Sequence, residues 1–259
     1  MRIKIHIRHN ENMILPFDYQ YAVQQWIYKT ISNADAEIAR RLHDIGYISE
    51  GKTFKLFCFS PWYGQPFKVE REKGIRLLSN RSEILISFLL PEVLEIFVAG
   101  LFKDQQHTFY FKGGISISIL TNQIEILPTP AWTNGMMRYS LKTGARISQN
   151  MEGRKHPLYI SPDHEEYGIR FTQNLLNKLN ASTMNIQTNS INYEAVNMKI
   201  ISDTRSHVYN IHKDGETIKS KTWSFDFSLD APVHVHRTLY YAGAGEECSL
   251  GMGWAEMKG

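Results

Sequence analysis

Near its end the chain reads Gly-Ala-Gly-Glu-Glu-Cys-Ser-Leu-Gly-Met-Gly-Trp over residues 243–254, which places four glycines within eleven residues. Glycine reaches positive φ at no steric cost and lets other backbone or a ligand approach closely, so this segment is typical of a tight, exposed loop. Its amides would suit phosphate oxygens. Glycines at this spacing also occur in hairpins and bulges that bind nothing. The loop is neither a P-loop nor a dinucleotide fingerprint, because it lacks Gly-Lys-Ser/Thr and a βαβ setting.

Outward from this loop, the apolar pattern predicts an α+β protein. Ile3, Ile5 and Ile7 alternate with basic residues and predict a first strand with one apolar face. Asp18 is placed to cap a first helix and Asn33 a second, which Gly46 would end. The predicted helices lie at about 18–31, 34–45, 91–101, 163–180 and 233–242, and the further strands at about 54–60, 75–79, 83–89, 108–119, 123–127, 185–201, 216–229 and 252–257.

The order of these elements predicts two tandem ferredoxin-like units with antiparallel sheets, each following the order β-α-β-β-α-β with the first helix of the first unit split in two. The first unit would span residues 1–122 and the second residues 123–259. The glycine-rich loop would then join the last helix to the last strand of the second unit.

Composition narrows the class of protein. The chain is 42% hydrophobic and 21% charged, which is typical of a globular protein. No apolar run reaches the ~18 residues of a membrane span, and the N-terminus alternates instead of forming a signal-peptide core, so we expect a cytoplasmic protein with no membrane contact. The two cysteines, Cys58 and Cys248, form no pair with metal-ligand spacing. We therefore expect no disulfide framework, no metal and no cofactor.

The net charge of +3 hardly indicates a nucleic-acid partner by itself, but the charge is unevenly distributed. Positive charge is concentrated at the front of the chain. The back half is more acidic, but it contains one stretch of basic residues in which Glu152 is the only acidic residue. Such a segment predicts a basic loop, either a solvated surface connection or an arm that contacts phosphates. Its basic residues are Arg138, Lys142, Arg146, Arg154 and Lys155.

Several segments resemble one known protein family in the same order along the chain. The ending over residues 243–253 resembles the signature loop of the RAMP-class CRISPR-associated proteins, and more narrowly it is similar to the repeat-cleaving endoribonuclease family, Cas six. The other segments that carry the resemblance are LPFDYQY at 15–21, QWIY at 25–28, RLHD at 41–44, KLFCFS at 55–60 and YISP at 159–162. They cover both halves of the chain.

The resemblance implies a metal-independent endoribonuclease, in which the ribose 2′-hydroxyl attacks the adjacent phosphate. This chemistry needs a base, an acid for the leaving 5′-oxygen and positive charge near the phosphorane. The resemblance places Tyr28 at the base or orienting tyrosine, His43 at the catalytic histidine and Lys55 at the lysine that stabilises the transition state, with Lys52 as the alternative. On the residues alone, His43 could be a packed or solvated residue and Tyr28 a core residue. Because the pKa of tyrosine is about 10, tyrosine is a poor base at neutral pH. Orientation of the 2′-hydroxyl is therefore an equal alternative to proton abstraction as the role of Tyr28.

The implied partner is the repeat region of a CRISPR precursor transcript, which would be left with a 2′,3′-cyclic phosphate and a 5′-hydroxyl. Phosphate contacts would come from the basic residues named above and from Gly243, Gly245, Gly251 and Gly253. Two alternatives stay open: a catalytically inactive RAMP-fold subunit that holds RNA in a CRISPR effector complex, and an assembly scaffold. A homodimer is open as well.

Overall fold

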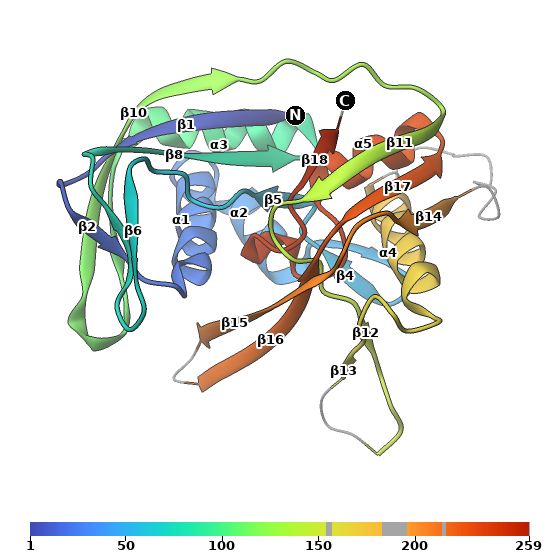
Figure 1. Cartoon of the computed structure of the whole chain (residues 1–259). Helices are drawn as coiled ribbons and strands as arrows, with labels where there is room; N and C mark the ends of the chain where they lie inside the picture. Colours follow the sequence, from blue (N-terminus) through green and yellow to red (C-terminus); the bar gives the residue numbers. More distant parts are fainter. Residues whose placement is uncertain (154–156, 183–195, 214–215, 259) are drawn as a thin grey trace.

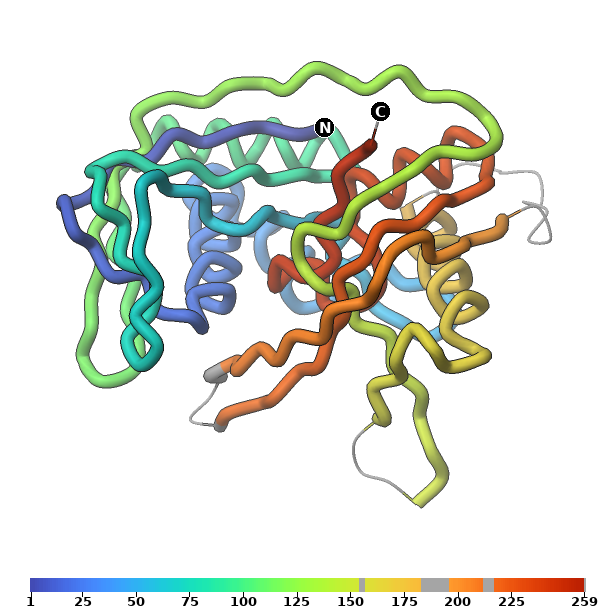
Figure 2. The backbone as a smooth tube through the Cα atoms, viewed as in Figure 1, coloured from blue at the N-terminus to red at the C-terminus, as the bar shows by residue number. Residues whose placement is uncertain are grey.

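The computed structural model describes residues 1–153, 157–182, 196–213 and 216–258. Its two larger sheets are antiparallel and lie side by side, the first formed by the N-terminal half and the second by the C-terminal half (Figure 1). A long connection over residues 127–134 passes from one sheet to the other (Figure 2). Among the described residues, no helix is both long and apolar enough to cross a membrane.

The first sheet has the predicted N-terminal strand near its centre. Ile3, Ile5 and Ile7 are fully buried there, as their alternation predicts. All strand pairs in this sheet are antiparallel. Across the sheet the strands are β5 (Phe57–Phe59), β8 (Arg81–Phe88), β1 (Arg2–Arg8), β10 (Ser116–Ile126) and β9 (Gln106–Tyr110).

Two long helices cover one face of this sheet, α1 (Tyr19–Ala34) and α3 (Pro91–Lys103). Asp18 occupies the position before α1. The predicted cap at Asn33 is wrong, because α1 continues through it. Instead the extended residue Asp35 caps α2 (Ala36–Arg40), accepting a hydrogen bond from the Ile38 amide at 2.9 Å. A π-helical turn, Arg41–Ile45, follows α2 and ends at Gly46, which has the predicted positive φ of 65°.

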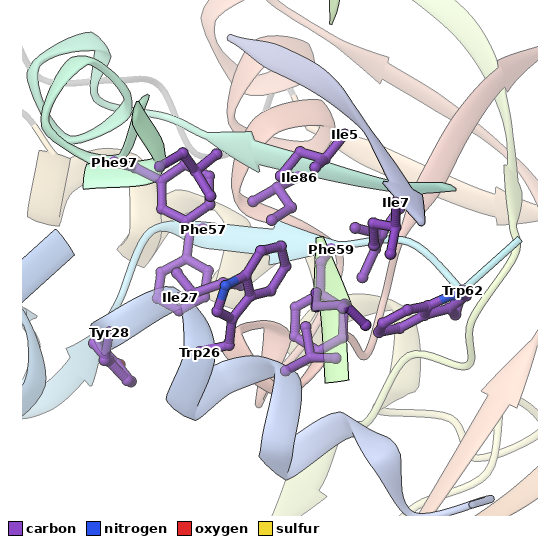
Figure 3. Close-up of a cluster of buried hydrophobic side chains, with 14 of the residues drawn as sticks. Ile5, Ile7, Trp26, Ile27, Tyr28, Phe57, Phe59, Trp62, Ile86 and Phe97 are labelled. Carbon is purple, nitrogen blue, oxygen red and sulfur yellow. The ribbon is translucent and has the colours of Figure 1, made fainter. Parts of the chain in front are cut away.

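Aromatic and β-branched side chains fill the space between this sheet and α1. Trp26 and Ile27 of α1 pack toward Ile5, Phe57 and other side chains of the sheet, and Tyr28 lies at the edge of the same cluster (Figure 3). Tyr28 meets Phe57 edge to face, with 5.7 Å between the ring centroids. Tyr28, which is predicted as the base or orienting tyrosine, is thus partly a core residue.

Smaller hairpins surround the first sheet. The predicted strand at 54–60 is two strands, because Leu56 adopts a left-handed conformation (φ 55°) that breaks the extended chain. The first of these strands belongs to a hairpin and the second is the edge strand β5. The additional strands are β2 (Met13–Leu15), β6 (Phe67–Glu70) and β7 (Gly74–Leu77) in one sheet, and β3 (Tyr47–Ser49) and β4 (Lys52–Phe54) in another.

The second sheet packs against α4 (Tyr167–Ser182) and α5 (Val233–Ala242) around its own apolar cluster. Its strands, in order across the sheet, are β14 (Asn197–Ile200), β17 (Asp226–Ala231), β11 (Gly135–Leu141) and β18 (Ala255–Lys258). The other elements of this half are the pair β12 (Ser148–Gln149) and β13 (Leu158–Tyr159), and the hairpin β15 (Arg205–Lys213) and β16 (Glu216–Ser224), which projects from the body of the molecule (Figure 1).

Besides the strand at 54–60, three further strand predictions differ from the structure. The predicted strand at 108–119 is the hairpin of β9 and β10, because the chain turns through Lys112–Gly114, where Gly113 and Gly114 have positive φ. The predicted strand at 216–229 is two strands, which belong to different sheets and separate at Phe225. Of the predicted strand at 185–201, residues 185–195 lie outside the described residues and the rest forms β14.

The predicted boundary between residues 122 and 123 falls inside a strand. β10 continues to Ile126, which pairs with Ile3 of β1, so the predicted separate strand at 123–127 is the end of β10. A β-bulge interrupts the pairing of β1 with β10 between His6 and Ile7, and the parts of β10 on both sides of it belong to the first sheet. The change from the first sheet to the second therefore occurs in the connection 127–134.

Both sheets share one connectivity among the described residues. If β1, β5, β8 and β10 are numbered in chain order, they stand in the sheet as 2-3-1-4. The strands β11, β14, β17 and β18 of the second sheet stand in the same order. A long helix follows the first strand and another follows the third strand in each set.

Candidate active site

Tyr28 of α1 and His43 are in ring contact. Their rings are edge to face, with 5.0 Å between centroids and 82° between planes. Tyr28 projects from α1, whereas His43 lies in the π-helical turn after α2. The sharp break at Asp35 reverses the chain so that the two residues, fifteen apart in sequence, come into contact.

The side chain of His43 is 54% exposed, so it is accessible to a substrate. Its Nδ1 lies 2.8 Å from Asp44 Oδ1. A carboxylate at that distance accepts a hydrogen bond from Nδ1–H, which leaves Nε2 as an acceptor in the neutral ring, or as a donor once the ring is protonated. The arrangement suits transfer of a proton at Nε2.

Tyr28 is in a different environment, because only 8% of it is exposed. Burial, reinforced by the negative charge of Glu247, raises the pKa of the phenol well above its ordinary value near 10. The phenol is therefore protonated at neutral pH and suits hydrogen bonding to a hydroxyl or phosphate oxygen better than proton abstraction.

The two lysines that compete for one predicted role stand in different places. Lys55 follows the β3–β4 hairpin, and its ammonium donates to Leu42 O at 2.8 Å and to His43 O. It thus holds the turn that carries His43. Lys52 is exposed on β4 and lines the same cleft.

These four residues line one cleft of about 910 Å³ between the two halves of the molecule. The opposite wall comes from the second half and includes Arg146, Lys178 and residues 245–250 of the glycine-rich loop. Residues far apart in sequence are therefore brought to one site. Of the residues that the sequence predicts to contact RNA, Arg146 and Gly245 line the cleft.

The glycine-rich loop owes its composition to close packing within the protein. A Cβ on Gly253 would lie 1.9 Å from Ala244 O, and one on Gly251 would lie 2.4 Å from the Phe59 ring. The amides of Gly243, Gly251 and Gly253 donate to protein carbonyls, at Leu239, Cys248 and Gly144 respectively. We therefore retain the prediction of a phosphate contact through the amide for Gly245 alone.

The prediction of a single basic loop is wrong, because the described basic residues lie in different places. Arg138 lies on β11, where Met137, Tyr139 and Leu141 alternate inward, so that Arg138 faces solvent. Lys142 is 3.7 Å from Glu256 and does not line the cleft. Arg154 and Lys155 lie outside the described residues.

Arg146 lies in the cleft, but acidic groups surround it. Its Nε is 3.2 Å from Glu246 Oε2 and its Nη1 is 3.7 Å from Glu247 Oε1. The Arg146 carbonyl also accepts the amide of Glu246, and a Cβ on Gly245 would lie 2.5 Å from that carbonyl. Arg146 therefore links the glycine-rich loop to the strand region before β12.

Sequence reasoning missed several polar groups of the cleft. Arg170 of α4 pairs with Glu166, which lies just before that helix. Gln24 of α1 donates to Ser249 Oγ at 2.8 Å, and Lys178 of α4 is buried against the glycine-rich loop. Lys178 carries a signal that could have found it: it lies within the apolar stripe of its helix, between the buried Leu175 and Leu179. A lysine there needs buried polar partners.

Two family models match the chain. The model for the N-terminal part of CRISPR-associated protein Cas6 matches residues 14–111, and the model for the C-terminal part of Cas6 matches residues 133–257. The gap between the matches, residues 112–132, includes most of the connection from the first sheet to the second. Together the two models cover both walls of the cleft.

Individual relatives agree with this result. The chain is 26% identical over 261 residues to CRISPR-associated endoribonuclease Cas6 1 of Methanocaldococcus jannaschii, covering 98% of this chain and 91% of that protein. The structure is similar to that of the product of a Cas6-related gene from Pyrococcus furiosus, with a TM-score of 0.81, 20% identity and coverage of 100% and 98% of the two chains. A RAMP protein described as binding different RNA substrates also has a TM-score of 0.81, at 18% identity over all of both chains.

Proposed function

Because this chain belongs to the Cas6 family of CRISPR-associated endoribonucleases, we propose that it matures guide RNA by cutting precursor transcripts within their repeats. The observation that carries the proposal is the cleft, where an exposed histidine, a protonated buried tyrosine and two lysines meet. We propose that the cut needs no metal and leaves a 2′,3′-cyclic phosphate and a 5′-hydroxyl.

In this proposal the 2′-hydroxyl of the nucleotide before the cut attacks the adjacent phosphorus and the bond to the 5′-oxygen of the next nucleotide breaks. His43 is the group that moves protons at Nε2, because its other nitrogen is held by Asp44 and its side chain is exposed. The 2′-hydroxyl must lose its proton and the leaving oxygen must gain one, so the protonation state of His43 decides which step it assists.

Tyr28 acts by orientation in this proposal. Its phenol is protonated, so it can donate to the 2′-hydroxyl oxygen or a phosphate oxygen and hold the attacking group in line. Tyr28→Phe removes that donor while it keeps the ring contacts with Phe57 and His43. We expect a lower rate of cleavage with little loss of stability.

The two lysines receive different roles. Lys55 donates to the carbonyls of Leu42 and His43, so we propose that it positions His43. Lys52, exposed on β4 at the cleft, is left to stabilise the charge of the phosphorane. Under this assignment, Lys52→Met lowers the rate of cleavage but not protein stability, whereas Lys55→Met lowers both. Lys68→Met, at an exposed position on β6 outside the cleft, is the control.

RNA affinity would come mainly from phosphate contacts. Arg146 and Gly245 line the cleft, and the exposed Arg138 and Lys142 would contact RNA that runs beyond it. Arg154 and Lys155 stay predicted RNA contacts on the basis of the sequence alone. Each lost contact with a phosphate should lower the slope of log affinity against log salt by about one. Arg138→Ala therefore tests whether the face of the second sheet binds RNA.

The fold follows the same proposal. We propose that each sheet with its two long helices is a ferredoxin-like unit, supported by the shared strand order and by helices after the first and third strands. The first unit carries Tyr28, His43, Lys52 and Lys55, and the boundary lies in the connection 127–134.

The test is cleavage of a transcript that carries the host's CRISPR repeat by the wild type and by His43→Ala. Loss of a general acid or base commonly lowers a rate by about 10²–10⁴. His234→Ala, at an exposed position on α5 outside the cleft, is the matched control. Tight binding by the wild type without cutting would favour an RNA-holding subunit, and absence of both would favour a scaffold.

A further inference from the structure

The two cysteines of the chain lie together beside the cleft. Cys58 is on β5 of the first sheet and Cys248 is in the glycine-rich loop; they are 0% and 6% exposed. A Cβ on Gly243 would lie 3.0 Å from Cys58 Sγ and 2.9 Å from Cys248 Sγ, so both sulfurs pack against the same glycine. Neither sulfur has a part in the proposed cleavage.

A buried cation faces one of these sulfurs. Lys178 of α4 is 3% exposed, and its Nζ lies 3.1 Å from Cys248 Sγ. The same Nζ donates to Gly243 O and Gly245 O, each at 2.7 Å. Carbonyl oxygens satisfy its hydrogen bonds but carry no full charge, and a buried ammonium is strongly stabilised by an anion. The sulfur of Cys248 is placed to be that anion.

The two thiols differ in their tendency to ionise. Burial alone would raise the pKa of the Cys248 thiol, but the neighbouring Cys58 thiol and the charge of Lys178 outweigh burial and lower that pKa to about 7. Burial and the proximity of Cys248 raise the pKa of the Cys58 thiol well above its ordinary value. The pair therefore consists of one thiolate-forming sulfur and one protonated thiol, and the thiolate is the reactive form of cysteine.

We propose that Cys248 and Cys58 form an oxidation site for hydrogen peroxide, with Cys248 as the attacking thiolate and Cys58 as the resolving thiol. Cys248 is one of the residues that line the cleft, and the cleft is the side from which peroxide would reach its sulfur. Cys58 does not line the cleft and belongs with Cys248 and Trp254 to one buried cluster.

The reaction has two steps. The Cys248 thiolate attacks one peroxide oxygen, the O–O bond breaks, and the products are Cys248 sulfenic acid and hydroxide, which takes a proton to become water. The sulfur of Cys58 then attacks the Cys248 sulfur, the S–O bond breaks, and the departing hydroxide leaves as water with the proton of the Cys58 thiol. Two thiols are oxidised to one disulfide, and one peroxide is reduced to two waters.

The product would be a covalent link between the two halves of the molecule. It would join β5, at the edge of the first sheet, to the loop that leads to the last strand of the second sheet. A disulfide requires the sulfurs to close to about 2.05 Å, and contact of both with Gly243 leaves only a short movement of the loop.

The test uses the full chain without RNA, so its outcome is independent of the proposed nuclease activity. Reduced protein is treated with hydrogen peroxide, unfolded, alkylated with N-ethylmaleimide and measured by intact mass and peptide mapping. We expect the loss of two hydrogens, no alkylation, and an intramolecular Cys58–Cys248 peptide that dithiothreitol reverses. Two alkylated thiols, over-oxidised Cys248 without a disulfide, or a disulfide between molecules would each overturn the proposal.

Variants assign the two roles. Cys58→Ser should stop at the sulfenic acid of Cys248, which dimedone traps, whereas Cys248→Ser should leave Cys58 unreacted at the same peroxide concentration. Lys178→Met removes the cation and should slow disulfide formation at least tenfold. If Cys248→Ser and the wild type lose their Cys58 thiol at equal rates, Cys248 is not the attacking group and the proposal is wrong. Circular dichroism of the reduced variants confirms that each is folded, and Cys58→Ala replaces Cys58→Ser if the serine variant is not.

Discussion

Arg2 ties the first sheet to the second, and its replacement by methionine tests how strongly the two halves are joined. The residue is 4% exposed on β1. Its guanidinium donates to Tyr240 O at 2.6 and 3.2 Å and to Ala255 O at 2.6 Å. The guanidinium carbon also lies 3.3 Å from the centre of the Tyr240 ring and 3.8 Å from that of Trp254. Burial lowers the pKa of Arg2 to about 10, so the group stays charged at neutral pH.

The expected loss of stability follows from these contacts. Arg2→Met leaves two buried carbonyls without their donor, which costs about 1–3 kcal/mol each, and removes two cation–π contacts worth up to roughly 2 kcal/mol each. The variant no longer buries a charge, which returns several kcal/mol, and methionine fills part of the space. The net loss in free energy of unfolding should therefore be about 3 kcal/mol.

Urea unfolding of the purified full chain, followed by far-ultraviolet circular dichroism, measures this loss. Arg2→Lys keeps the charge but not the planar fork and should fall between the wild type and Arg2→Met. Arg8→Met, on the same strand at an exposed position, should change the free energy of unfolding by less than about 0.5 kcal/mol. A change of that size for Arg2→Met would refute the reasoning, because it would mean that the buried guanidinium contributes no net stability.

Three further predictions concern stability. Burial, with a smaller effect of Lys29, lowers the pKa of His107 to about 4, so between pH 4 and about 6.5 the unfolded chain binds the proton and the folded chain does not. The free energy of unfolding should therefore fall as the pH drops through this window. Urea unfolding at several pH values should show a flatter dependence on pH for His107→Gln than for the wild type. Gly253→Ala should cost more than about 3 kcal/mol because of its contact with Ala244 O, whereas Gly51→Ala, with a similar positive φ and no atom within 4 Å, should cost about 1–2 kcal/mol; equal thermal shifts would contradict the packing account. Asp35→Ala should cost about 1 kcal/mol by removing the cap of α2, and Asp35→Asn should restore most of it.

Local patterns predicted the elements whose signal lies in a few neighbouring residues. The alternation of Ile3, Ile5 and Ile7 predicted β1, and the helix predicted at 233–242 is α5. The break at Leu56 was missed because its cause is not a local preference: Leu56 adopts positive φ, which is rare for a branched side chain and is imposed by the surrounding structure. The break between β9 and β10 did have a local signal, the pair Gly113 and Gly114, which the prediction did not use. The end of β10 was misplaced because only its pairing with β1 shows that it belongs to the first sheet.

The residues of the site also divide into those that the sequence predicted and those whose roles it could not predict. His43 and Tyr28 were predicted through resemblance to a family, and the chain break at Asp35 brings them together. The roles of the two lysines depend on backbone carbonyls that no sequence pattern reveals, since Lys55 contacts residues that lie before the β3–β4 hairpin. Arg138 could have been excluded from a loop, because Met137, Tyr139 and Leu141 follow a strand period on either side of it.

The central claim is that His43 moves protons in a metal-independent cut of repeat RNA. The most direct measurement is single-turnover cleavage of the host's CRISPR repeat transcript in excess EDTA by the wild type and His43→Ala, with RNA affinity measured in parallel. We expect the wild type to cut and to leave 2′,3′-cyclic phosphate and 5′-hydroxyl ends, and His43→Ala to bind as tightly while it cuts about 10²–10⁴-fold more slowly. Cleavage only when Mg²⁺ is added, or an undiminished rate for His43→Ala, would contradict the account.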